Sequence, residues 1–248
     1  MGTKTRNTTV GYLLLGLTLA LGLIIASFLL SSTLHDIKSN EQTITVKGYA
    51  EKDIVSDLGV WNGYISVTSY DLVSGYQKLQ NDFKILLKYL ADKNIAKNDI
   101  KLGPISNYKN FRYTSDGRRT DLIAGYTLER RITVTSTNID LIDKLGSDAT
   151  SLIQQGLEIT SNSPQYFYTK LNDLKIEMLG KATKDAKERA KIIAESSGTE
   201  IGAVKSARQG VFQITARNSS AISDWGEFDL TSIEKTIKAV VTASFVVK

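Results

Sequence analysis

The sequence has no cysteine and a single histidine, and these two shortages exclude most metal and nucleophile chemistry. Without cysteine there are no thiolate ligands for zinc and no disulfides. The lone histidine, His35, precedes the first predicted strand and is interpreted as a linker residue, because a Ser-His-Asp triad needs its base held beside a nucleophile. No glycine-rich phosphate loop occurs either, since Gly59 and Gly63 lie within a strand pattern. We therefore predict a protein that is not an enzyme, with no catalytic residues, no metal and no cofactor.

With no cysteine and one histidine, a metal site in this chain would need oxygen ligands from Asp and Glu side chains. Glu51, Asp53 and Asp57 lie close together in the sequence, but the spacing of a calcium-binding loop does not surround them. We interpret them as surface charge. Because disulfides are absent, the stability of the fold has to come from a hydrophobic core or from assembly.

Charged residues are missing from residues 10–34, whose sequence is VGYLLLGLTLALGLIIASFLLSSTL. A helix of these 25 residues covers roughly 37 Å, which is enough to cross a hydrocarbon core of about 30 Å. We predict a transmembrane helix over 10–34, between a cytoplasmic tail (1–9) and a linker (35–42). A cleaved signal peptide is the alternative, but the run is longer than a signal-peptide core and Ser31-Ser32-Thr33 is a poor cleavage site.

The flanking charges predict the orientation of this anchor. Lys4 and Arg6 precede the apolar run, and basic flanks favour the cytoplasmic side of the inner (cytoplasmic) membrane. Residues 43–248 are therefore predicted in the periplasm or outside the cell. The net charge of +5 arises from 31 basic and 26 acidic residues spread along the chain, whereas a nucleic-acid-binding surface needs a dense basic patch. We expect the partners to be the lipid bilayer, copies of the chain itself and other envelope proteins, and not nucleic acid.

Beyond the linker, hydrophobic periodicity predicts strands in pairs beside helices. Apolar residues recur at helical spacing after Asp71, and alanines recur every fourth residue from Ala182 to Ala194. Asn94 is predicted to end the first helix, with Ile95 folding back onto its last turn. The predicted strands are a strand from residue 43, then 57–70, 99–113, 122–137, 157–161, 201–214 and 237–247; the predicted helices are 71–94, 138–155 and 165–197, and 218–229 is predicted to be a loop.

Two prolines and a few glycines refine this prediction. Pro104 is predicted at a strand edge or bulge, where its missing N–H does no harm, and Pro164 at the start of the third helix. Gly156 and Gly198 are predicted to end helices. The order of elements predicts an α+β domain over 43–248, with helices packed on a mainly antiparallel sheet.

Several motifs of this chain together resemble the SIMPL-domain family, and in particular its membrane-anchored bacterial branch of predicted periplasmic proteins. The residues that carry the resemblance are Gly48, Glu51, Asp57, Trp61, Pro104, Pro164, Gln165, Asn172, Lys175, Met178, Gln209 and Gly210. The resemblance covers residues 43–248. It implies an envelope protein of α+β fold that is linked to stress tolerance and forms large homo-oligomers, with no agreed enzymatic activity.

A run of three aromatic residues, Tyr166, Phe167 and Tyr168, cannot face one core together, because neighbours on a helix point about 100° apart. We predict that its exposed members join Trp225 and Phe228 in a contact with another subunit or partner. The alternative is that one ring packs inward and the others cover a sheet edge. The predicted function is a membrane-anchored scaffold or ring built by self-association; the alternative is a module that binds a small ligand, glycan or protein in a groove between sheet and helices.

Overall fold

The structure is a computed structural model that describes residues 16–27, 42–221 and 223–248. Residues 16–27 are helical. Within the described ranges, no helix combines the length and the apolar character needed to cross a membrane. Residues 10–15 and 28–34 of the span predicted over 10–34 lie outside the described residues, as do the predicted tail over 1–9 and all but residue 42 of the linker predicted over 35–42, His35 included.

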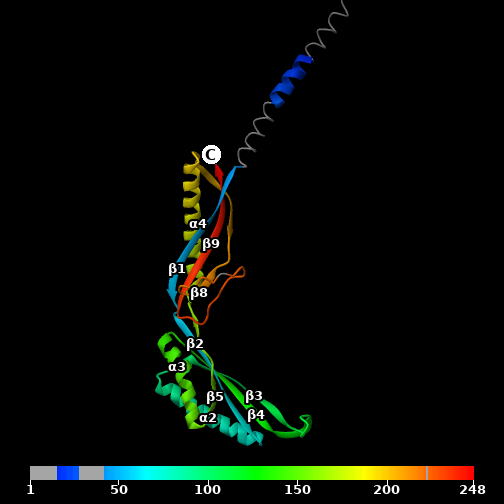
Figure 1. Cartoon of the computed structure of the whole chain (residues 1–248), viewed down its shortest axis with the longest axis vertical. Helices are drawn as coiled ribbons and strands as arrows, with labels where there is room; N and C mark the ends of the chain where they lie inside the picture. Colours follow the sequence, from blue (N-terminus) through cyan, green and yellow to red (C-terminus); the bar gives the residue numbers. More distant parts are fainter. Residues whose placement is uncertain (1–15, 28–41, 222) are drawn as a thin grey trace, which may run out of the picture. The chain divides into compact units, whose positions relative to one another are not determined.

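From residue 42 onward the chain is an α+β fold in which strands come before each helix (Figure 1). The strands are β1 (Thr43–Val55), β2 (Leu58–Ser69), β3 (Ile100–Tyr113), β4 (Arg119–Ser136), β5 (Glu158–Ser161), β6 (Gln165–Phe167), β7 (Ile201–Gln209), β8 (Gln213–Ala216) and β9 (Glu234–Val247). The helices are α2 (Leu72–Asp92), α3 (Ile139–Asp148) and α4 (Leu171–Ser196), with short 3-10 helices at Lys97–Asp99 and Ala149–Gln155. The predicted fold class is confirmed in its α+β character and its antiparallel pairing.

The part predicted as one domain divides into two compact units. Unit 1 comprises the described residues up to Ala50 together with Leu179–Gly210 and Val240–Lys248. Unit 2 comprises Glu51–Met178 and Val211–Ala239. Strands β1 and β9 and helix α4 therefore contribute residues to both units.

Unit 1 places the C-terminal part of α4 against strand β1. The predicted stripe of small residues is confirmed, because Ala182, Ala186, Ala190 and Ala194 are all fully buried. Small side chains allow close approach, and the α carbon of Gly48 in β1 lies against the backbone of Ala182 and Ala186. The strand order is β1-β9-β7, and the alternating apolar residues of β9 are buried from Ile237 through Phe245.

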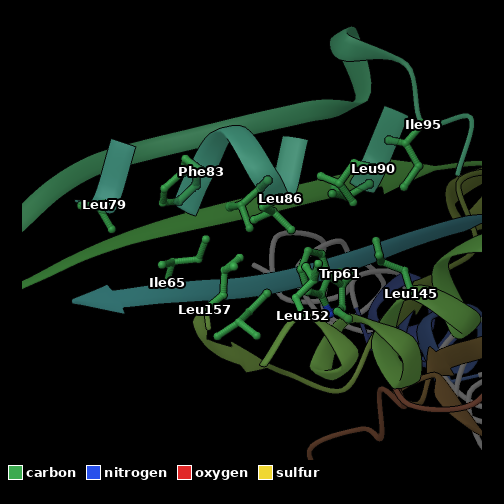
Figure 2. Packing of buried hydrophobic residues seen from close by; sticks show 14 of the residues in the cluster. Trp61, Ile65, Leu79, Phe83, Leu86, Leu90, Ile95, Leu145, Leu152 and Leu157 are labelled. Carbon is green, nitrogen blue, oxygen red and sulfur yellow. The ribbon is translucent and has the colours of Figure 1, made fainter. Parts of the chain in front are cut away.

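Unit 2 is built on a sheet with the strand order β3-β4-β2-β5, and β6 pairs with the other end of β2. Helices α2 and α3 both contact β2 and β4. Figure 2 shows the resulting core, in which the apolar side chains of α2 point towards Trp61 and Ile65 of β2. Both of these residues of β2 are fully buried.

The ends of α2 agree with the helix predicted over 71–94. Asp71 has an extended backbone, and its carboxylate accepts a hydrogen bond from the backbone N–H of Ser74 at 2.7 Å. Asn94 has a positive φ of 60°, and the N–H of Ile95 donates to the carbonyl of Leu90 at 3.0 Å. Local signals were sufficient here because a cap depends on residues within one turn.

The predicted start of the third helix at Gln165 is wrong. Gln165–Phe167 form strand β6, and α4 begins only at Leu171. The N–H of Tyr166 donates to the carbonyl of Leu230 at 2.8 Å, a partner that is distant in sequence. Long-range pairing therefore overrides a local helix signal. The second helix also differs from its prediction, because it changes to a 3-10 helix after Asp148 before Gly156 ends it with a φ of 83°.

Candidate functional site

The five aromatic residues predicted to form a contact come from two segments of unit 2. Tyr166 is buried, with only 4% of its surface exposed, whereas Trp225 is 94% exposed and Phe228 is 52% exposed. Phe167 and Tyr168 are half-buried. Four of the five, all except Trp225, line one small cavity of about 10 Å³. The exposed aromatic surface is therefore offered by Trp225 and Phe228.

Tyr166 has a structural role inside unit 2. Its hydroxyl donates a hydrogen bond of 2.6 Å to the carboxylate of Asp143 in α3. Burial raises the pKa of the Tyr166 hydroxyl, and the neighbouring carboxylate of Asp143 raises it further. The side chain thus ties β6 to α3 and leaves almost no surface for a partner.

Trp225 and Phe228 belong to the segment between β8 and β9, residues 217–233, which we call the aromatic loop. The amide of Gln213 in β8 bonds Ser223 twice: its Nε2 donates to the Ser223 carbonyl at 2.6 Å, and its Oε1 accepts from the Ser223 N–H at 3.4 Å. Lys238 of β9 donates to the carbonyl of Ser219 at 2.7 Å. Lys235 of β9 donates to the carbonyl of Asp229. Three strand side chains therefore hold the loop at three separate points.

Backbone bonds add to this fixation on either side of Trp225. The N–H of Ile214 donates to the carbonyl of Glu227, and the N–H of Asp229 donates to the carbonyl of Ile214, both at 2.8 Å. Gly226 turns the chain with a φ of 91°, a backbone conformation that glycine adopts without strain. Ser219, Ser223, Glu227 and Asp229 of the loop are consequently bonded to strands β8 and β9, although the composition of the segment predicted a loop.

Lys235 of β9 and Asp229 of the aromatic loop are two oppositely charged residues that interact with each other. Only 2% of the surface of Lys235 is exposed. Burial lowers the pKa of its ammonium group, and the nearby carboxylate of Asp229 counteracts that effect. Burial raises the pKa of the Asp229 carboxyl, but hydrogen bonds from Ser232 and Thr231 and the charge of Lys235 outweigh it and lower that pKa to about 2.

The family-motif residues mostly hold the fold together. The carboxylate of Asp57 accepts bonds from the N–H of Thr169 at 2.7 Å and from its hydroxyl at 2.8 Å, just before α4 begins. The indole of Trp61 donates to the hydroxyl of Ser161 at 2.8 Å. Pro164 lies against Gly146, and Met178 is fully buried. The ammonium group of Lys175 lies over the ring of Phe212, and the N–H of Gly210 donates to the carbonyl of Val240. The remaining motif residues with exposed side chains are Glu51, Gln165, Asn172 and Gln209.

Sequence reasoning missed the residues that fix the aromatic loop. Gln213 and Lys235 are polar residues in strands, and their sequence gives no sign that they face inward. Lys238 is likewise an ordinary strand lysine until its carbonyl partner is known. In the part of the chain that the structure describes, no group of three or more His, Cys, Asp or Glu side chains comes together as a metal site.

The geometry defines a class of protein: an α+β chain of two compact units in which the aromatic loop exposes Trp225 and Phe228. Residues 44–245 match the model of the SIMPL family, described as a protein of unknown function (DUF541). The chain therefore belongs to the SIMPL family, and the predicted family is confirmed. The comparison with curated proteins gave no match.

A pH-dependent effect is expected from the buried Tyr166 hydroxyl. Its folded-state pKa lies above the ordinary value of 10, so the folded chain keeps this proton at a pH where the unfolded chain has lost it. The resulting stability is fully present below pH 10 and is lost progressively as the pH rises above it. Tyr166→Phe removes this titration, so chemical denaturation of both proteins from pH 8 to 11 should show the variant's deficit shrinking above pH 10. A deficit that stays constant across this range would contradict the expectation.

Proposed function

We propose that the chain is a membrane-anchored envelope protein whose SIMPL domain associates with copies of itself through the aromatic loop. The single observation that supports this most strongly is the 94% exposure of Trp225 on a loop fixed at three points. A ring that is 94% exposed buries almost none of its apolar surface within its own chain. Tryptophan is also the residue type most enriched among those that dominate binding energy at interfaces.

The fixation of the loop favours binding because it reduces the entropy lost on association. A mobile loop would have to be ordered when a partner binds, at a cost of about 0.5–1.5 kcal/mol for each immobilised side chain. Here the ordering has already been achieved by Gln213, Lys235 and Lys238 on folding. Trp225 and the half-exposed Phe228 are therefore presented in a defined geometry.

The membrane anchor is the second part of the proposal. The charge-free run over residues 10–34 supports a single span of the inner membrane, and Lys4 and Arg6 support a cytoplasmic N-terminus. The SIMPL domain would then lie in the periplasm or outside the cell. Anchors restrict the chains to one plane, which raises their effective concentration and allows weak individual contacts to build a scaffold or ring. We propose that this assembly contributes to stress tolerance of the cell envelope, as the family resemblance implies.

The proposal is tested by the double substitution Trp225→Ser with Phe228→Ser in the full-length protein. We expect the detergent-solubilised variant to have a lower mass than the wild type by light scattering coupled to size-exclusion chromatography. Loss of a dominant interface residue costs at least about 2 kcal/mol, which is roughly a 30-fold weaker contact. Both substituted residues are at least half exposed, so the fold should be retained.

Tyr70→Ser provides a matched control. Tyr70 is 93% exposed and also aromatic, but it follows β2 and lies outside the aromatic loop. This control should keep the wild-type mass. If the double variant keeps that mass as well, the aromatic loop is not the contact and the proposal fails.

A further inference from the structure

The sheet of unit 2 has a second face, opposite the one that packs against α2 and α3. Side chains alternate along a strand, so Trp61 and Ile65 of β2 face the core and Tyr64 faces away from it. A cavity of about 600 Å³ lies over Tyr64 and its neighbours on β3 and β4. This volume is within the range of small-ligand sites, about 300–1,000 Å³. The cavity is on the helix-free face and not in the predicted groove between sheet and helices.

A β-bulge shapes this cavity. The pairing of β3 with β4 shifts between Leu102 and Ile105, so that Gly103 and Pro104 together lie beside Arg131. Pro104 was predicted at such a bulge, and the prediction is confirmed. The carbonyl of Gly103 accepts a hydrogen bond of 2.9 Å from Nε of Arg130, which fixes the bulge. Because Gly103 has no side chain, the space beside Arg131 stays open.

The guanidinium of Arg131 is held in place on this face. It lies over the ring of Tyr64, 4.8 Å from the ring centre, and it donates a hydrogen bond to the Tyr64 hydroxyl. An arginine carries five N–H donors in a planar fork that suits a carboxylate, and Tyr64 uses only part of this capacity. Lys101 on the neighbouring strand adds a second cation to the cavity.

The remaining lining residues restrict the chemistry of a ligand further. Glu129 is the one carboxylate in the lining, and it would repel a second anionic group while accepting hydrogen bonds from hydroxyls. Tyr108 also lines the cavity and is 54% exposed, and its ring offers an apolar face. The combination of two cations, one carboxylate and an aromatic face suits a sugar ring with a carboxylate and several hydroxyls.

We propose that this cavity binds a saccharide that carries one carboxylate on its recognised sugar unit. Arg131 and Lys101 bind the carboxylate, Glu129 accepts from a sugar hydroxyl, and Tyr108 packs against the ring. The site is separate from the aromatic loop and stands whether or not the chain self-associates.

Binding is tested by calorimetry on the full-length protein in a detergent without a sugar headgroup. The acidic probes are sialyllactose, trigalacturonate and a hyaluronan tetrasaccharide, and lactose is the neutral partner of sialyllactose. We expect at least one acidic probe to bind more tightly than lactose. The affinity for that probe should fall as the salt concentration is raised. Arg131→Gln should weaken that binding about 10- to 100-fold, the effect of losing a hydrogen bond between charged groups.

Two exposed lysines of β3 serve as a further pair. Lys101→Gln removes a cation that lines the cavity and should lower the affinity for the acidic probe. Lys109 lies on the same strand but does not line the cavity, so Lys109→Gln should leave the affinity unchanged. Because Lys101 is exposed, this variant remains informative even if Arg131→Gln fails to fold. The proposal is overturned if no acidic probe binds, if lactose binds as tightly, or if Lys109→Gln has the same effect as Lys101→Gln.

Discussion

Replacing Gly48 with alanine should destabilise unit 1 by about 3 kcal/mol or more and lower Tm by about 10 °C. A Cβ atom at this position would lie 2.0 Å from the carbonyl oxygen of Ala182 and 2.5 Å from the backbone nitrogen of Ala186. Both of these are backbone atoms of α4, so no side chain can rotate away to make room. The helix would have to move off strand β1, and the packing of its buried alanines would be lost with it.

Gly180→Ala is the matched control for this prediction. Gly180 lies in the same helix, is exposed, and has no heavy atom within 4 Å of an added Cβ. Alanine favours a helix over glycine by about 0.5–1 kcal/mol, so this variant should be slightly more stable than the wild type. Thermal and chemical denaturation of both variants should therefore give changes of opposite sign. A Gly48→Ala protein as stable as the wild type would show that β1 and α4 do not approach as closely as described.

The second large effect is expected for Lys235→Met, which should cost about 3 kcal/mol of unfolding free energy. The substitution keeps the length of the buried side chain but removes its charge. Oδ2 of Asp229 is buried without a hydrogen-bond partner among the described residues, so the ammonium group of Lys235 is the charge that compensates it. Without that charge, a carboxylate and a carbonyl of the aromatic loop are left in an apolar site.

A double-substitution cycle separates this pair from general packing effects. Asp229→Asn removes the carboxylate charge, so the combination with Lys235→Met should recover much of the stability that Lys235→Met loses alone. Lys109→Met, at an exposed strand position, should change the stability by less than about 0.5 kcal/mol. If the double variant is as unstable as the sum of the two single variants, Lys235 and Asp229 do not act as a pair.

The elements that the sequence predicted well depend on local rules. Helix α2 could be placed because its apolar stripe, the Asp71 cap and the Asn94 stop all lie within or beside the helix itself. The alanine stripe of α4 was predictable for the same reason, because small residues at every fourth position line up on one face of a helix and let it pack closely. Strands β3 and β4 followed from strand composition, and the place of Pro104 at an edge or bulge followed from the missing N–H of proline.

The elements that were predicted wrongly depend on partners far away in the sequence. The run after Pro164 had the appearance of a helix start, but the carbonyl of Leu230 and strand β2 hold it extended. No local pattern contains that information. The two compact units also have no local signal in the sequence, because β1, α4 and β9 contribute residues to both.

The exposed residues of the candidate site could be predicted from the sequence, but the buried residues that hold the aromatic loop in place could not. Aromatic residues in a polar segment indicated Trp225 and Phe228, and their exposure keeps them as the proposed contact. Tyr166 was grouped with them from its sequence neighbours, but it is buried against Asp143. The buried partners Gln213 and Lys235 could not be recognised, because a polar residue in a strand is usually solvated.

The most direct test of self-association is the mass of the detergent-solubilised full-length wild-type protein, corrected for bound detergent, across a dilution series. One chain has a mass of 27.3 kDa. We expect a multiple of this mass that persists until the chain concentration falls below the dissociation constant of the contact. A protein mass of 27.3 kDa at every concentration would contradict the proposed assembly.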